Sequence, residues 1–137
     1  MQRVDATGLY DITVIGINYD PAEDIDKSRW PGRIIPAVTV ADMYNPDVYG
    51  RQKFLNELGK GIYDIGFIIQ DTFIVQTIIK QIDETRNALE KKFATVLYYP
   101  IDATPKSEWI EHCVDHIDFP VPYTNYAKRE SIDVFPS

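Results

Sequence analysis

Three side chains near the C-terminal end have the spacing of a metal site. Glu108, His112 and His116 follow one another at intervals of four residues, which places them on one face of a helix. Two imidazoles one turn apart can share a divalent metal ion, and a carboxylate one turn earlier can supply a third ligand. The sequence offers no distant residue to complete the site, so the alternative is that these side chains lie on the solvent-facing side of the helix. We favour the alternative and expect no metal ion and no other cofactor.

Cys113 is the only cysteine of the chain and lies in the same predicted helix, which runs from Glu108 to about His116. Its apolar neighbours in the helix form the opposite face, so we expect the thiol to point inward and to be unreactive. A single cysteine excludes an intramolecular disulfide and a cysteine-based zinc site. It favours a reducing compartment, so we expect the protein to be cytoplasmic at synthesis.

Other patterns with possible chemistry are incomplete. The acidic stretch from Asp20 to Asp26 could bind calcium through its carboxylates, but it lacks the glycine and the final glutamate of an EF-hand. Gly59-Lys60-Gly61 could suggest a phosphate-binding loop, yet these residues precede a strand instead of following one. There is no Gly-x-Ser-x-Gly motif for a nucleophilic serine. No reaction type stands out, and an enzyme is not the favoured interpretation.

The stretch from Ile62 to Tyr99 is the predicted centre of the fold and reads as strand, helix, strand. In the first strand Tyr63, Ile65, Phe67 and Ile69 form a fully apolar face, whereas the other face is mixed. Apolar residues then recur at helical spacing from Val75 to Phe93. Residues 94–99 are β-branched and aromatic and stop at a proline, as expected for a second strand. The pattern predicts an α+β domain with a mixed sheet of about four strands covered by one long helix.

Two further strands and two short helices complete the prediction. Residues 9–19 read as a strand, and residues 33–41 read as an edge or bulged strand because Pro36 interrupts them. A short helix is expected after Asp47, since Asn-Pro-Asp precedes it, and Gly59 or Gly61 is expected to end it. The helix around Cys113 is the second.

The last residues have neither helical nor strand period until a candidate short strand from Ile132 to Phe135. Residues 120–137 contain three prolines and scattered aromatic residues, and we therefore expect a domain over residues 1–119 followed by an extended C-terminal arm. An arm of this kind would have to bury its aromatic side chains against a neighbouring chain.

Composition limits the kinds of partner. The chain has 137 residues, enough for one domain, and 21 acidic against 14 basic residues give a formal charge of −7. That charge disfavours nucleic acid as a partner. The first residues lack the apolar run of a signal peptide, and polar residues interrupt the most apolar stretch, so a membrane-bound protein is not expected.

The aromatic residues outside the predicted core favour a protein that works through protein contacts. Nine tyrosines and two tryptophans are available, a residue class enriched at interfaces. The predicted interface residues are Trp30, Tyr44, Tyr49, Phe119, Tyr123, Tyr126 and Phe135. We expect a homo-oligomer or a chain held by neighbouring subunits.

The function favoured by these features is that of a structural subunit of a large assembly, with a phage or virion tail, neck or baseplate component as the leading form. In that case the protein would be located in the virion after its synthesis in the cytoplasm. The alternatives are a small metal-dependent hydrolase that uses the helix of His112 and His116, and an acidic inhibitor or immunity-type protein that binds a basic partner.

Overall fold

The computed structural model describes residues 7–17, 19–20, 22, 32–39, 47–102, 110, 113 and 115–134. It contains mixed helices and strands with two small parallel sheets, which supports the general α+β prediction. The chain divides into two compact units, Met1–Phe54 and Leu55–Ser137. The predicted domain boundary after residue 119 stays a prediction.

The first unit contains a pair of parallel strands, β1 (Thr13–Gly16) and β2 (Arg33–Pro36). Their register places Gly16 opposite Pro36, and the Ala37 N–H then donates to the Gly16 carbonyl at 3.0 Å. Because Pro36 is the last residue of its strand, its missing N–H interrupts no bond inside the ladder. Each strand has four residues and is shorter than the predicted strands over residues 9–19 and 33–41.

Helix α2 (Arg51–Leu58) confirms the predicted short helix. The Asp47 carboxylate accepts the Gln52 N–H at 2.7 Å, which satisfies a donor that the first helical turn leaves free. The helix ends before Gly59, as the sequence predicts.

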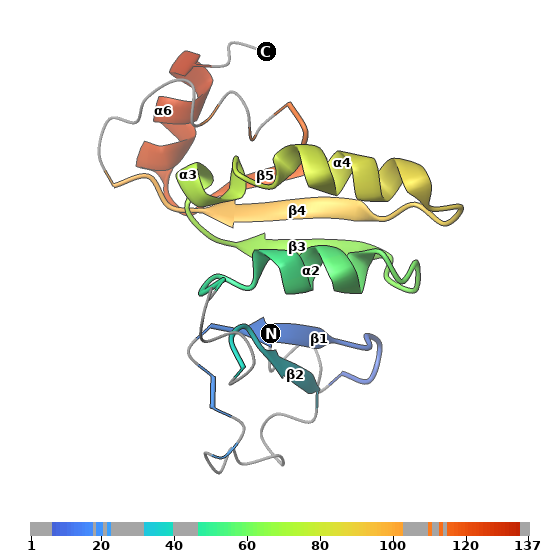
Figure 1. Ribbon diagram of the computed structural model, residues 1–137. Helices are drawn as coiled ribbons and strands as arrows, with labels where there is room; N and C mark the ends of the chain where they lie inside the picture. Colours follow the sequence, from blue (N-terminus) through green and yellow to red (C-terminus); the bar gives the residue numbers. More distant parts are fainter. Residues whose placement is uncertain are drawn as a thin grey trace. The chain divides into compact units, whose positions relative to one another are not determined.

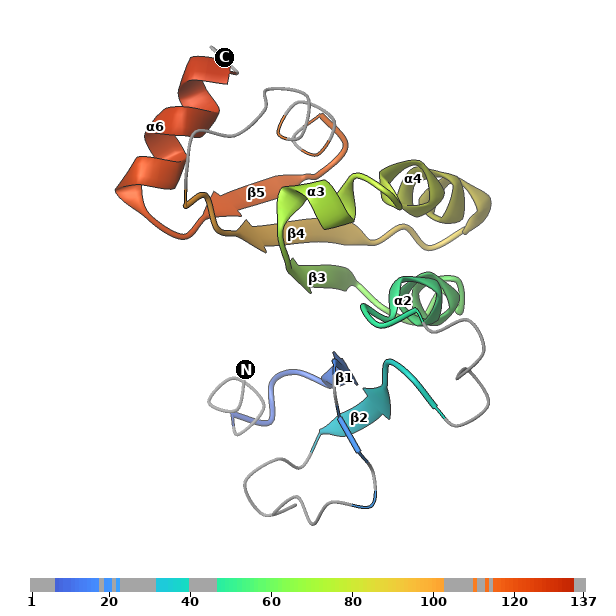
Figure 2. The ribbon, with the colours of Figure 1, turned by 60° about the vertical axis from the view of Figure 1, so that its left-hand side comes forward.

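The second unit is built on three parallel strands in the order β3 (Ile65–Ile69), β4 (Ala94–Tyr99) and β5 (Phe119–Pro122). Helices α3 (Thr72–Val75) and α4 (Ile79–Ala88) connect β3 to β4 and lie on one side of the sheet, as Figures 1 and 2 show. Parallel neighbours require such a crossover. The predicted strand over residues 94–99 is confirmed to the residue.

The single long helix predicted from Val75 to Phe93 is wrong. The helix begins earlier, breaks after Val75 and resumes as α4. At the break the Thr77 hydroxyl donates to the Ile74 carbonyl at 2.7 Å, and Ile78 adopts φ −123° and ψ 2°. Threonine and isoleucine are stiff at χ1 and crowd a helical turn, which explains why the run of β-branched residues leaves the helical path.

The two faces of the three-stranded sheet differ in exposure. On the side of α3 and α4 the side chains of Thr95, Leu97 and Tyr99 are fully buried. The opposite face we call the open face. It consists of Ile65, Phe67, Ile69, Val96, Tyr98, Phe119, Val121 and Tyr123, which the strand register and the stacking of Tyr123 on Tyr98 bring together. The fully apolar side of β3 thus lies on the exposed face, and its mixed side lies under the helices.

The extended C-terminal arm predicted over residues 120–137 is also wrong where the structure describes it. Residues 119–122 form strand β5, and helix α6 (Asn125–Val134) follows. The Thr124 hydroxyl accepts the Ala127 N–H at 3.0 Å and so caps α6. Ala127 is fully buried, and the Tyr99 and Ser131 hydroxyls are 2.8 Å apart, so the helix packs on the sheet.

Proline is tolerated in β5 because that strand is the edge of the sheet. Pro120 and Pro122 alternate with Val121 and Tyr123, and the Tyr123 N–H donates to the Tyr99 carbonyl of β4 at 3.0 Å. The period of two therefore directs the two proline nitrogens away from β4, where no ladder bond is lost.

Candidate functional site

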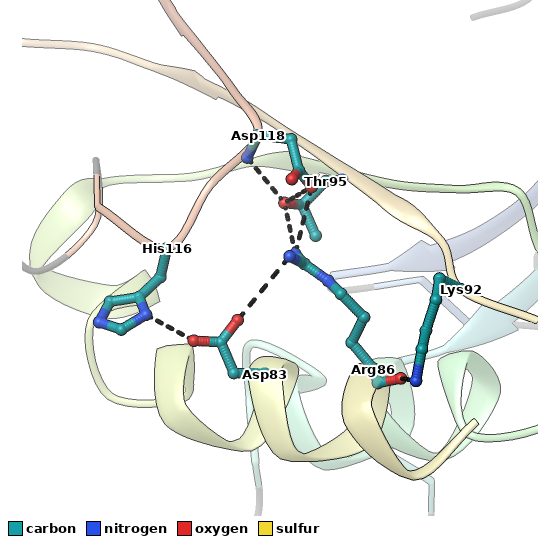
Figure 3. Close-up of polar contacts among 6 residues, drawn as sticks. All are labelled: Asp83, Arg86, Lys92, Thr95, His116 and Asp118. Atoms are coloured by element: carbon teal, nitrogen blue, oxygen red, sulfur yellow. Dashed lines mark hydrogen bonds and ion pairs between the residues drawn. The ribbon is translucent and has the colours of Figure 1, made fainter. Parts of the chain in front are cut away.

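The most connected polar cluster among the described residues surrounds His116 (Figure 3). His116 lies just before β5, and its Nδ1 is 2.5 Å from the Asp83 Oδ2 of helix α4. Asp83 Oδ1 is 3.9 Å from an Nη of Arg86, one helical turn further along α4. The spacing of three residues places both side chains of α4 on the face that approaches the sheet.

Thr95 is the centre of this cluster. Its hydroxyl accepts from Arg86 Nη2 at 2.9 Å and from the Asp118 N–H at 3.1 Å, and it donates to Asp118 Oδ2 at 2.8 Å. The Thr95 N–H also donates to Asp118 Oδ2, at 2.7 Å. Three hydrogen bonds between Thr95 and Asp118 thereby join the start of β4 to the residue that precedes β5.

Arg86 supplies the positive charge of the cluster. Its Nη2 is 3.2 Å from Asp118 Oδ2, and its guanidinium carbon lies 5.5 Å from the centre of the Phe93 ring. The Arg86 Nε is buried without a hydrogen-bond partner in the part of the chain that the structure describes. The burial of a donor without a partner costs free energy, and the contacts of Arg86 Nη2 with Thr95 and Asp118 offset this cost.

The pKa of Asp118 reflects two opposing effects. Partial burial raises the pKa of the carboxyl, but the Thr95 N–H and hydroxyl and the charge of Arg86 together outweigh it. The pKa of Asp118 therefore lies below its ordinary value, and the folded protein favours the carboxylate.

The imidazole of His116 borders a depression with a volume of about 370 Å³. The depression is lined by Gln76, Thr77, Ile79, Lys80, Gln81, Glu84 and His116. Asp83 orients the ring through Nδ1, and the other ring nitrogen points away from Asp83 in Figure 3. An imidazole held in this way can accept or donate a proton, which is the minimum for general acid–base chemistry. Among the described residues of the lining there is no serine or cysteine to act as a nucleophile.

The position of the cluster in the sheet favours a structural role. Thr95 is the second residue of β4, and Asp118 directly precedes β5, so the cluster lies at the amino ends of parallel strands. Ligands of open α/β sheets bind at the opposite edge, outside the carboxyl ends. The contacts of Asp83, Arg86 and Asp118 fasten helix α4 to the two strands that it crosses.

The predicted metal ligands are placed only in part. Glu108 and His112 lie outside the described residues, and His116 pairs with Asp83. In residues 7–17, 19–20, 22, 32–39, 47–102, 110, 113 and 115–134 no group of three or more histidine, cysteine or acidic side chains could hold a metal ion.

The prediction for Cys113 is confirmed as to burial. The side chain is fully buried, and burial raises the pKa of the thiol to about 12 despite a hydrogen bond from the backbone of Gln76 that lowers it. At neutral pH this thiol carries almost no reactive thiolate.

Four of the predicted interface residues are described, whereas Trp30, Tyr44 and Phe135 lie outside the described residues. Phe119 and Tyr123 are exposed and belong to the open face, and Tyr126 is half-buried in α6. Tyr49 is exposed in the first unit, where the Arg51 guanidinium lies 5.9 Å from its ring centre.

The sequence does not predict the partners of His116, and it identifies Ile65, Phe67 and Ile69 of the open face as an apolar strand face but not as an interface. Asp83 and His116 are 33 residues apart, and Thr95 and Asp118 are 23 apart, so local periodicity carries no sign of either pair. The one available signal was the fully apolar face of β3, which is the exposed face of the folded sheet.

A second set of polar side chains follows the carboxyl ends of the strands. Gln70 and Asp71 follow β3, Asp102 lies just beyond β4, and Thr124 and Asn125 follow β5. Parallel strands end at one edge, so these residues share that edge of the sheet.

None of the helices in the described ranges is long and apolar enough to cross a bilayer. No model of a known protein family, no curated protein and no solved structure matches the chain.

Proposed function

We propose that this protein acts through protein–protein contacts as a subunit of a larger assembly, and that the open face of the three-stranded sheet makes the contact. A tail, neck or baseplate component of a phage or virion is the specific form of this proposal. This form is supported by the acidic net charge of the chain, its α+β character and its exposed aromatic residues.

The observation that carries the proposal is the composition of the open face. Phe119 is 57% exposed and Ile65 is 53% exposed, although both lie in regular strands. Parallel sheets normally have both faces covered, because their strands are apolar on both sides. A contiguous exposed apolar patch of this kind is typical of an interaction site.

Two residues that the sequence predicts as interface residues lie on this face. Phe119 lies in β5 and Tyr123 directly follows it, and the Tyr123 ring packs against Tyr98 with a centroid distance of 4.0 Å. Rigid aromatic side chains bury much area at a small cost in side-chain entropy, which is why they dominate many interfaces.

Site-specific photo-crosslinking in the producing cell tests the proposal. A photoreactive phenylalanine analogue replaces Phe119 or Tyr123 in the full chain, and the same analogue at Ile132, an exposed residue of α6, is the control. We expect crosslinks to one defined protein surface from the two face positions and none from the control. Equal crosslinking at all three positions, or none at any, would contradict the proposal.

The parallel topology favours a second candidate, the binding of a small polar ligand at the carboxyl edge of β3, β4 and β5. The supporting observation is the group of polar residues that follows these strands, with Asp71 and Asp102 as its charged members. Other open parallel sheets bind their ligands at this edge, and the second candidate extends that placement to this sheet by analogy.

Titration calorimetry with a panel of nucleotides tests this second candidate, since nucleotides are common ligands of such edges. Binding that is lost in Asp71→Ala and Asp102→Ala, and kept in Asp133→Ala on α6, would support it. Heat changes of the same size in all variants would count against this site.

A further inference from the structure

We infer that the partner of the open face is a second copy of the same chain, bound face to face in a two-fold dimer. The inference rests on the proposed function, because it names the partner of the surface proposed there. It is carried by the charge, the area and the symmetry of that face.

The open face carries no charged side chain. Its members are isoleucine, valine, phenylalanine and tyrosine only, and the nearest charged residue along β3 is Asp64. Asp64 already pairs with Lys91 at 2.8 Å. A chain of charge −7 would repel a second copy through most surfaces, but here two copies meet without opposed like charges.

The exposed area of the face is sufficient for a dimer. Its six most exposed side chains are Ile65, Phe67, Ile69, Phe119, Val121 and Tyr123, which are between 40% and 57% exposed. Side chains of this size leave roughly 600 Å² open per copy, so that a dimer buries about 1,200 Å², the lower limit of stable interfaces. We therefore expect a reversible dimer that forms in the micromolar range.

The geometry of the face suits a two-fold contact. Isologous interfaces need a surface that is complementary to itself, and two sheet faces satisfy this requirement by stacking with interdigitated side chains. The residues of β3 and those of β5 with Tyr123 form opposite borders of the face, with Val96 and Tyr98 between them, and each border has both β-branched and aromatic side chains. A two-fold axis that lies between the two stacked sheets and runs parallel to β4 places the β3 border of one copy over the β5 border of the other.

Sedimentation velocity of the full chain over a range of about 1 to 200 µM measures the association expected for an interface of this size. The test variant is Ile69→Lys, and the matched control is Ile132→Lys, because the two isoleucines are 52% and 51% exposed. We expect the parent and the control to dimerise and Ile69→Lys to remain a folded monomer. A parent that stays monomeric, or a dimer that persists in Ile69→Lys, would overturn the inference.

A second measurement covers the case in which Ile69→Lys does not fold. The photoreactive analogue at Phe119 is incorporated into the purified full chain, and light and ¹⁵N-labelled protein are mixed in equal amounts. We expect crosslinked peptides of mixed isotope that join position 119 to residues of β3. Crosslinks within single-isotope chains only would show that the same chain covers the face, which would overturn the inference.

The two proposals fail separately. A protein that is monomeric in solution, but crosslinks from Phe119 to a different protein in the cell, overturns the dimer and leaves the proposed function standing. A protein that gives no contact from the open face in either experiment overturns both.

Discussion

Thr95 shows how one hydroxyl can organise a fold. It is fully buried, and it receives donors from helix α4 and from the residue before β5 while it donates to the Asp118 carboxylate. The removal of one hydroxyl from such a polar cluster leaves its hydrogen-bond partners unpaired, and each unpaired group costs free energy. The contribution of Thr95 is therefore larger than that of a single hydrogen bond.

We expect Thr95→Val to lower the free energy of unfolding by about 1–3 kcal/mol, because Arg86 Nη2 and the Asp118 N–H, both partly shielded from water, lose their acceptor. Thr95→Ser is the control: it keeps the hydroxyl and loses one methyl group, worth about 0.8 kcal/mol. Urea denaturation of the three proteins measures the difference. A smaller loss in the valine variant than in the serine variant would contradict the assigned role.

The pH dependence of stability gives a second prediction at this scale. The folded pKa of Asp118 is lowered, so its contribution is complete above about pH 4, the ordinary value of an unfolded aspartate, and is lost as the pH falls below it. Asp118→Asn should therefore be less stable than the parent at pH 7, and the gap should close in acid. Urea midpoints between pH 7 and pH 3 test this, with the exposed Asp102→Asn as the control.

At the scale of elements, the sequence predicts strand β4, helix α2 and the burial of Cys113, because each has a strong local pattern. It fails where a decision depends on tertiary structure. The alternation in β3 separates two faces but cannot tell which one the helices cover. The contacts of the His116 cluster join residues far apart in the chain, so the sequence predicts His116 as a candidate but not its partner Asp83.

The sequence does not predict helix α6, because its buried side also depends on tertiary contacts. Its cap, Thr124, follows two prolines that suggest an irregular chain, and its buried side consists of small residues such as Ala127 and Ser131. Hydrophobic periodicity is weak in such a helix. The packing surface comes instead from Tyr99 of the neighbouring strand.

We expect a chain that ends after Thr124 to lose about 3 kcal/mol or more, because the removal of α6 uncovers Tyr99, which is 1% exposed in the full chain. Thermal unfolding followed by circular dichroism measures this. An extended arm would be dispensable for folding, so a melting temperature within a few degrees of the parent would contradict the packing described for α6.

At the scale of the whole molecule, the two parallel sheets belong to separate compact units, whereas the sequence predicts one mixed sheet. Parallel and antiparallel pairs have the same side-chain period, so periodicity does not report strand direction. The net charge of −7 is a property of the whole chain and acts on every encounter between copies.

Salt should therefore strengthen the proposed dimer. Raising sodium chloride from about 0.05 M to about 0.5 M screens the repulsion between two acidic chains and leaves the burial of the uncharged open face intact. We expect the dissociation constant measured by sedimentation to fall. An association that weakens with salt would indicate an interface built on ion pairs.

We expect the two prolines of β5 to protect the protein from aggregation as well. A sheet edge with a full row of free donors and acceptors is a template for strand addition, and Pro120 and Pro122 remove the donors from the outer side of this one. The double substitution Pro120→Val and Pro122→Val restores them next to exposed apolar side chains. We expect the variant to form β-rich aggregates at concentrations where the parent stays clear, as light scattering would show. Pro120 and Pro122, which make β5 hard to recognise in the sequence, would thus also prevent a further strand from pairing with its outer edge.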